Sequence, residues 1–120
     1  MKHVHTLQTI AEWEECKQNI PKHGLIILKF SPRCPISRSV ERDFDAWCEQ
    51  LADETALLCA KVNVVSSREL SQHLAQELNV WHESPQAIWL TPEHTVRWHD
   101  SHRSITRKAL NTQLCLPINK

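Results

Sequence analysis

One cysteine stands in a setting that makes its sulfur chemically reactive. The segment from Phe30 to Ser37 follows an apolar run and precedes a regular helical pattern, so Cys34 is expected at the first turn of a helix. The unpaired backbone N–H groups and the positive dipole end at such a position favour the thiolate over the thiol. Arg33 adds a positive charge nearby, and the Ser37 hydroxyl can donate a hydrogen bond to the sulfur. We interpret Cys34 as a nucleophile, with Arg33, Pro35 and Ser37 stabilising its thiolate.

The thiolate matters because it is the form that attacks disulfides. A thiol with an ordinary pKa of about 8.5 is only a few per cent ionised at pH 7. The alternative is that Cys34 is a packing cysteine, but packing cysteines lie inside apolar stripes and Cys34 stands in a polar turn bounded by prolines. With Ser37 three residues later there is no local resolving thiol, so a one-cysteine site is predicted.

The other four cysteines are poor partners for Cys34. Cys48 lies fourteen residues along the same predicted helix, roughly 21 Å away, which exceeds the reach of a disulfide. Cys59 stands mid-strand in an apolar run and is expected in the core, and Cys16 lies on an apolar helical face. Cys115, close to the end of the chain, stays open as a distant resolving thiol.

A second feature is the Ser84–Pro85 bond, which directly precedes a predicted strand and is a candidate cis peptide. A cis bond there would present the backbone of Ser84 as an unpaired edge that can hold an extended peptide or thiol substrate. Trp81, just before this turn, is equally consistent with the core and with the flank of a substrate groove.

The elements that must position these residues alternate along the chain. A capping box at Thr9 opens a helix, and a second one at Ser66 opens another. The pattern of one βαβ unit, a β-hairpin and a closing helix predicts a single α/β domain over residues 1–120, with helices on both faces of a mixed sheet. The expected strands are a short one near Val4 and those at 25–30, 57–65, 86–90 and 95–99, and the expected helices span 9–20, 35–51, 66–78 and about 104–114.

Three motifs in this order resemble the monothiol bacilliredoxin family: Cys34-Pro-Ile-Ser37, His82-Glu-Ser-Pro-Gln86 and Trp98-His-Asp-Ser-His102. The resemblance covers essentially the whole chain. It implies a thioredoxin-like fold, with four or five strands flanked by about four helices. It also implies an enzyme without a bound cofactor, a thiol–disulfide oxidoreductase that reduces mixed disulfides between client proteins and a low-molecular-weight thiol such as bacillithiol. Cys34 would take the small thiol off the client, and a second thiol molecule would regenerate it.

The resemblance also assigns a substrate groove. In a thioredoxin-like fold the loop after the hairpin lies close to the proline edge, so Ser84, Pro85, Ser101 and His102 are expected to contact the small thiol. The chain departs from the family pattern at Phe30, where the family often has a basic residue, and this difference could alter substrate choice near the sulfur.

Composition excludes several other functions. Fourteen basic and fourteen acidic residues leave no net charge for nucleic-acid binding, and a single glycine excludes Gly-rich phosphate loops. The sequence has no apolar run of transmembrane length and no signal-peptide pattern, so we expect a cytoplasmic protein with reduced thiols and no membrane partner. Of the eight histidines, we interpret His3, His5, His99 and His102 as surface or loop residues and not as metal ligands.

Two other classes of function use the same residues. In a redox sensor or binding domain, Cys34 would be capped reversibly by oxidation or by the small thiol without turnover. In a structural thioredoxin-like domain the thiol would be inert.

Overall fold

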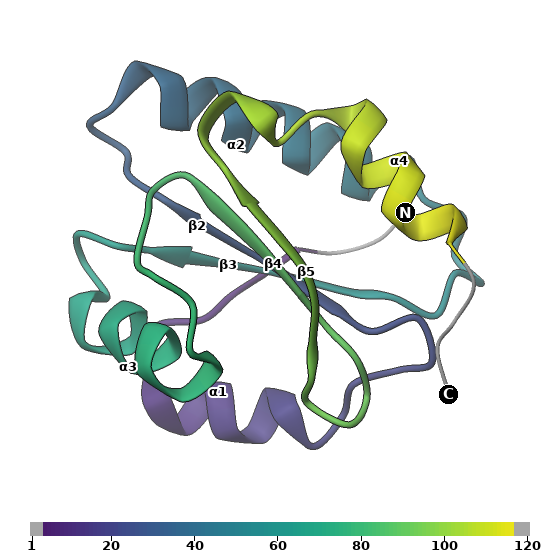
Figure 1. The fold of residues 1–120 in the computed structure, drawn as a ribbon, viewed down its shortest axis with the longest axis horizontal. Coiled ribbons are helices and arrows are strands. Elements are labelled where there is room, and N and C mark those ends of the chain that lie inside the picture. Colours follow the sequence, from purple (N-terminus) through teal and green to yellow (C-terminus); the bar gives the residue numbers. More distant parts are fainter. Residues whose placement is uncertain (1–3, 117–120) are drawn as a thin grey trace.

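The structure is a computed structural model that describes residues 4–116. It contains a five-stranded sheet between two layers of helices (Figure 1). The elements in chain order are β1 (Val4–Thr6), α1 (Ile10–Lys17), β2 (Leu25–Phe30), α2 (Pro35–Glu49), β3 (Leu58–Asn63), α3 (Arg68–Leu78), β4 (Gln86–Leu90), β5 (Val96–Ser101), a 3₁₀ turn (His102–Ser104) and α4 (Arg107–Cys115).

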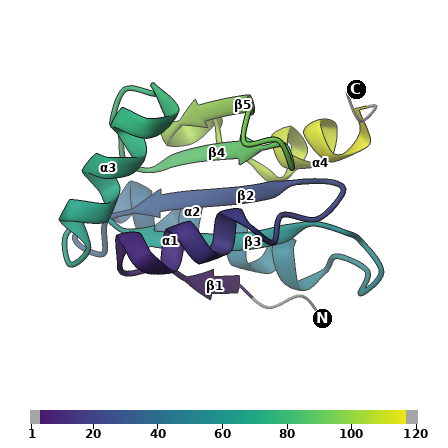
Figure 2. The same cartoon turned by 90° about the horizontal axis from the view of Figure 1, so that it is seen from below.

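The strand order across the sheet is β1-β3-β2-β4-β5, with β1 and β5 at its two edges (Figure 2). The strands β1, β3 and β2 are parallel, whereas β4 runs antiparallel to both β2 and β5. The helix α2 connects the parallel neighbours β2 and β3, and β4 and β5 form the hairpin. The predicted mixed sheet, βαβ unit, hairpin and short first strand are therefore confirmed.

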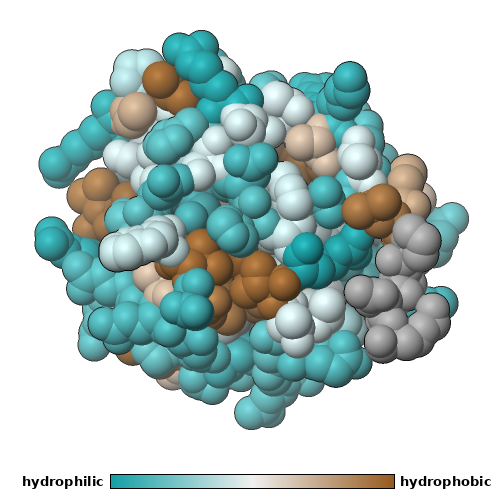
Figure 3. Space-filling model, viewed as in Figure 1, coloured by the Kyte–Doolittle hydropathy of each residue, from teal (hydrophilic) through white to brown (hydrophobic). Residues whose placement is uncertain are grey.

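The helices cover the two faces of the sheet in pairs, α2 with α4 and α1 with α3 (Figure 1). Alternate residues of β2 face opposite layers, so Ile26 and Leu28 pack in the α2 layer and Leu25 and Ile27 in the α1 layer. All six residues of β2 are buried, as expected for a central strand with a neighbour on each side. On the face shown in Figure 3, hydrophilic side chains cover most of the surface around a central hydrophobic group.

The end of β2 is fixed to its neighbour by the backbone. The N–H of Val64 donates to the carbonyl of Phe30 at 2.9 Å, one residue beyond the last paired residue of β3. At the other end of β2, Gly24 has a φ of +105°, and a Cβ there would lie 2.3 Å from the Leu90 carbonyl oxygen. The chain's one glycine therefore occupies a position that a side chain could not.

The Thr9 half of the first predicted capping box is confirmed, because the Thr9 hydroxyl accepts from the N–H of Glu12 at 3.1 Å, whereas the reciprocal bond of Glu12 goes to the residue before the cap. The Glu12 carboxylate in turn accepts from the N–H of Gln8 at 2.7 Å. The helix itself ends at Lys17, before the predicted boundary at Ile20.

The second predicted capping box is wrong. Helix α3 begins at Arg68 after the N-cap residue Ser67, whose side chain makes no capping hydrogen bond. The Asn63 side-chain oxygen instead organises this turn by accepting from the N–H groups of Val65 and Ser66. The competing local acceptor moves the N-cap by one residue, from Ser66 to Ser67.

Other boundaries also differ from the predicted ones, among them the end of α2, which is at Glu49 and not at Leu51. Strand β3 ends at Asn63 instead of Val65, because the turn above begins there. Strand β5 continues to Ser101, and the 3₁₀ turn that follows delays α4 to Arg107. Among the residues described, no helix has the length and apolar character needed to cross a bilayer.

Candidate active site

Cys34 is the N-cap residue of α2, at the point where β2 has turned into the helix. Its carbonyl accepts from the N–H of Arg38 at 2.9 Å, and its side chain is partly exposed. Pro35, the first helical residue, has no N–H, so the N–H groups of Ile36 and Ser37 are the unpaired donors of the first turn. The sulfur thus belongs to the N-cap residue at the positive end of a fifteen-residue helix, as the sequence predicts.

The other residues of the Cys34 turn have distinct positions. Ser37 is fully buried, and its hydroxyl oxygen accepts from the N–H of Ser31 at 2.7 Å. This bond ties the first turn of α2 back to the end of β2 and leaves the hydroxyl proton available to another acceptor. Arg33 and Pro35 are exposed, and the N–H of Arg33 donates to the Ser31 hydroxyl at 3.3 Å.

The Ser84–Pro85 peptide bond is cis. Pro85 is buried, and its carbonyl accepts from the N–H of His102 at 2.9 Å. The Ser101 hydroxyl donates to the Glu83 carboxylate, which fastens the end of β5 to the loop before the proline. The structure therefore brings Ser84, Pro85, Ser101 and His102 together. The Ser101 hydroxyl and the His102 N–H already form hydrogen bonds to Glu83 and Pro85 of this loop.

The pairing of β2 with β4 places the proline loop at the same end of the sheet as Cys34, where β2 ends and β4 begins. Lys29, near the end of β2, pairs with Gln86, the first residue of β4. The residues that precede Gln86 therefore lie beside the segment that leads from β2 to Cys34. The Ser84 hydroxyl oxygen is buried there and has no hydrogen-bond partner among the residues described. A buried hydroxyl oxygen without a partner is an acceptor that a substrate N–H can satisfy.

Two hollows lie at this end of the sheet, near the starts of α2 and α3. One, of about 390 Å³, is formed by the start of α2 and the 3₁₀ turn, and its lining includes Pro35, Ile36 and Arg103. The other, of about 270 Å³, is formed by the start of α3, the residue after β3 and the loop before Pro85, and is lined by Val64, Arg68, Ser71, Gln72 and His82. Trp81, which the sequence left open, is exposed and lines a wider hollow that also includes His82.

The remaining thiols differ from Cys34 in burial or position. Cys48 and Cys59 are buried, and the hydrogen bond with Cys59, together with burial, raises the pKa of Cys48. Burial also raises the pKa of Cys16, so both thiols stay protonated and unreactive at neutral pH. Cys115 is exposed at the C-terminal end of α4, which lies across the molecule from the start of α2 (Figure 1).

Lys29 is a residue of the site that the sequence analysis missed. Its side chain is fully buried in β2, and its ammonium donates to the Ser71 carbonyl at 3.2 Å. Within residues 4–116 it forms no ion pair with a carboxylate, and burial lowers the pKa of Lys29 to about 8. A lysine inside an apolar strand was the available signal, because a buried ammonium without a counter-charge is costly and rare.

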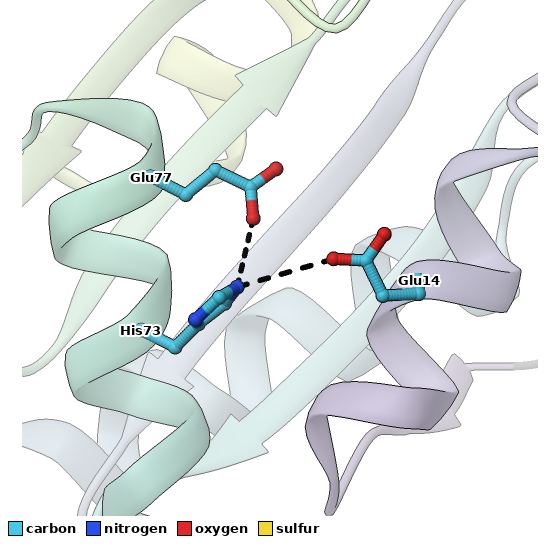
Figure 4. Close-up of side chains that lie close together, drawn as sticks. All are labelled: Glu14, His73 and Glu77. Atoms are coloured by element: carbon cyan, nitrogen blue, oxygen red, sulfur yellow. Dashed lines mark hydrogen bonds and ion pairs between the residues drawn. The ribbon is translucent and has the colours of Figure 1, made fainter.

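A separate cluster joins α1 to α3, where Glu14, His73 and Glu77 bring one ligand atom each to within 4.8 Å of the others (Figure 4). Lys17 contacts both carboxylates, at 3.1 Å from Glu14 and 2.5 Å from Glu77. Trp13 also donates to Glu77, at 3.0 Å. Although partial burial opposes it, these hydrogen bonds hold the pKa of Glu77 below its usual range. The cluster is an ion-pair network that fastens the two helices together.

The histidines considered as metal ligands in the sequence do not form this cluster. His5, His99 and His102 are exposed, and His3 lies outside the described residues.

Comparison with solved structures defines the class of protein. An oxidoreductase with a thioredoxin fold superposes with a TM-score of 0.78 at 26% identity, covering 92% of each chain. Thioredoxin from Malassezia sympodialis, at 11% identity, gives a TM-score of 0.72 and covers 95% of this chain and 90% of that one. Schistosoma mansoni thioredoxin, at 13% identity, also gives 0.72, with 94% and 96% covered. The fold is thioredoxin-like.

The particular family follows from the sequence. Residues 5–110 match the family described as monothiol bacilliredoxin BrxC, and the chain belongs to this family. Together with the thioredoxin-fold oxidoreductase, this membership supports a thiol redox function.

The buried ammonium generates a prediction about stability. The variant Lys29→Met, which keeps the length of the side chain without its charge, should be more stable than the wild type at pH 7. The folded pKa of about 8 lies below the ordinary value of 10.5, so between these pH values the unfolded chain binds more protons and wild-type stability rises. The advantage of the variant should therefore shrink by about 3 kcal/mol between pH 7 and pH 10.5.

Urea unfolding of both proteins at the two pH values, under reducing conditions, measures this difference. The exposed Lys108→Met is the matched control and should show no such pH dependence. A constant difference between Lys29→Met and the wild type would mean that the ammonium is not desolvated.

Proposed function

We propose that this protein is a monothiol thiol–disulfide oxidoreductase that removes a low-molecular-weight thiol of the bacillithiol type from S-thiolated client proteins. The observation that carries the proposal is the Cys34 turn. Its cysteine is the N-cap residue of α2, and the position where a second active-site cysteine could stand is a buried serine, Ser37. Family membership supports the same chemistry.

The reaction needs two exchange steps. The Cys34 thiolate attacks the small thiol's sulfur in the mixed disulfide, and the client cysteine leaves as a thiolate and takes up a proton. Cys34 is now disulfide-bonded to the small thiol. A second small-thiol molecule, as its thiolate, attacks the sulfur of the first and releases Cys34 with formation of the symmetric small disulfide. The small thiol is thus the reductant, and no bound cofactor is required.

The surrounding residues have separate roles in this scheme. The N–H groups of Ile36 and Ser37 stabilise the thiolate, and the exposed Arg33 adds positive charge. Pro35 starts the helix directly after the cysteine. The loop at Ser84 and Pro85 binds the extended substrate, and the bonds of Ser101 and His102 hold this loop in position.

The setting of the reaction follows from its reductant. A small thiol that regenerates Cys34 must be kept reduced, which is the condition of the cytoplasm. We therefore place the protein in the cytoplasm, with thiolated proteins and the small thiol as its partners and with neither nucleic acid nor membrane among them.

Turnover tests the proposal. With a client protein thiolated by bacillithiol and with excess free bacillithiol, wild-type protein should release many equivalents of client thiol per molecule. Cys34→Ser should reduce release to the rate seen without protein, because a serine hydroxyl is not ionised at neutral pH. Cys115→Ser, the matched change at an exposed cysteine, should retain the wild-type rate. Release is followed by intact mass of the client.

Two results would contradict the proposal. Release of a single equivalent, followed by a stable adduct on Cys34 in the presence of free thiol, would indicate a sensor that captures the thiol without turnover. Equal rates for Cys34→Ser and wild type would remove Cys34 from the chemistry.

The geometry of the turn generates a second prediction. Ser37→Cys should convert the site to a dithiol that forms an intramolecular disulfide with Cys34 under mild oxidation, because the two residues occupy the N-cap and third positions of one helix turn. Ser39→Cys, on the exposed side of the same helix, is the matched control and should form none. Peptide mapping after alkylation distinguishes the two, and a free Cys34 in oxidised Ser37→Cys would show that the proposed turn geometry is wrong.

A further inference from the structure

The hollow lined by Val64, Arg68, Ser71, Gln72 and His82, here called the α3 hollow, adjoins the active-site edge from two sides. On one side, Val64 donates its backbone N–H to the Phe30 carbonyl at 2.9 Å, at the end of the strand that leads to Cys34. On the other side, His82 is two residues before Ser84, in the loop that ends at the cis proline. The hollow therefore lies at the same end of the sheet as Cys34, beside the proline loop.

The α3 hollow collects positive charge without an acidic lining residue. Arg68, at the first position of α3, is exposed, and its guanidinium is available. Beneath the lining, the buried Lys29 ammonium donates to the carbonyl of Ser71 at 3.2 Å. The Ser71 hydroxyl lies 3.4 Å from Nδ1 of His82, so Lys29 and His82 both contact Ser71, and Arg68 lines the same hollow.

At the His82 ring the positive charges of Lys29 and Arg68 outweigh the opposing carboxylate of Glu83. Glu83, next to His82, accepts a hydrogen bond from Ser101 at the end of β5. Burial lowers the pKa of His82, and the charges of Lys29 and Arg68 lower it further against the opposite effect of Glu83. The part of this effect that comes from the positive charges of Lys29 and Arg68 attracts an anion to the same place.

We propose that the α3 hollow binds a carboxylate group of the low-molecular-weight thiol while the sulfur of that thiol is at Cys34, an inference that rests on the proposed de-thiolation. Arg68 is the principal contact, since a guanidinium binds a carboxylate through two parallel hydrogen bonds. Lys29 acts from below, and His82 closes the hollow from the proline loop. The volume of about 270 Å³ suits one end of a small molecule and not a segment of folded client.

Binding can be measured without any chemistry at sulfur. S-methyl bacillithiol carries the malate carboxylates but cannot exchange with a disulfide, so it serves as the probe for the reduced full-length protein. Its affinity, measured by calorimetry, should fall about tenfold or more when its carboxylates are esterified and by a similar factor in Arg68→Gln, as expected for a charged hydrogen bond. Arg42→Gln, at an exposed arginine on α2, should stay within about twofold of wild type, as expected for a screened surface charge.

Two further readouts separate binding from structural damage. Lys29→Met should weaken binding of the probe severalfold although it stabilises the fold, a combination that misfolding cannot produce. In NMR titrations of wild-type protein, the pKa of His82 should rise when the probe binds, because the bound anion favours the imidazolium.

The outcomes distinguish this proposal from the proposed function. Equal affinity for acid and ester, unchanged binding in Arg68→Gln, or an equal loss in Arg42→Gln would overturn the α3 hollow as the carboxylate site, even if client de-thiolation proceeds. Slower attack by Arg68→Gln on an acidic client, with normal binding of the probe, would assign the hollow to the client and overturn the proposal. The expected binding pattern in a protein that never turns over would retain the hollow and refute de-thiolation.

Discussion

The hydrogen bond from the Ser31 N–H to the Ser37 hydroxyl is the constraint on which the site depends. It closes the chain between the end of the central strand and the first turn of α2, with Cys34 inside the closed segment. The strand end is itself fixed by the bond from Val64 to Phe30. Because both ends of the turn are held by buried or backbone groups, the cysteine occupies the N-cap position without a capping bond of its own, and its sulfur remains partly exposed.

The buried Lys29 ammonium, at the same end of the sheet, destabilises the fold. A carboxylate beside Lys29 would offset the desolvation of its ammonium, but its bonded partner is the Ser71 carbonyl. Functional sites often retain such locally unfavourable groups, and the surrounding sheet compensates for them. The buried, doubly paired β2 supplies that compensation here, while the ion pairs of Lys17 with Glu14 and Glu77 secure α3 against α1.

Most of the fold could be predicted from the sequence because its signals are local. The apolar spacing in α2 and the proline after Cys34 locate the helix start, and the confirmed cis bond lies at the X-Pro pair directly before β4. The start of α3 could not be predicted, because Asn63 competes with the capping box for the backbone. The environment of Lys29 also depends on Ser71, forty-two residues away, which strand periodicity does not reveal.

The account's central claim is that Cys34 acts with no second protein sulfur, and intact mass spectrometry of wild-type protein tests it directly. After incubation of the reduced protein with excess bacillithiol disulfide and removal of the reagent, the account predicts one adduct, mapped to Cys34, that persists until free bacillithiol is added. Spontaneous loss of the adduct with formation of a protein species two hydrogens lighter than the reduced chain would contradict it, because another cysteine would then have resolved the mixed disulfide.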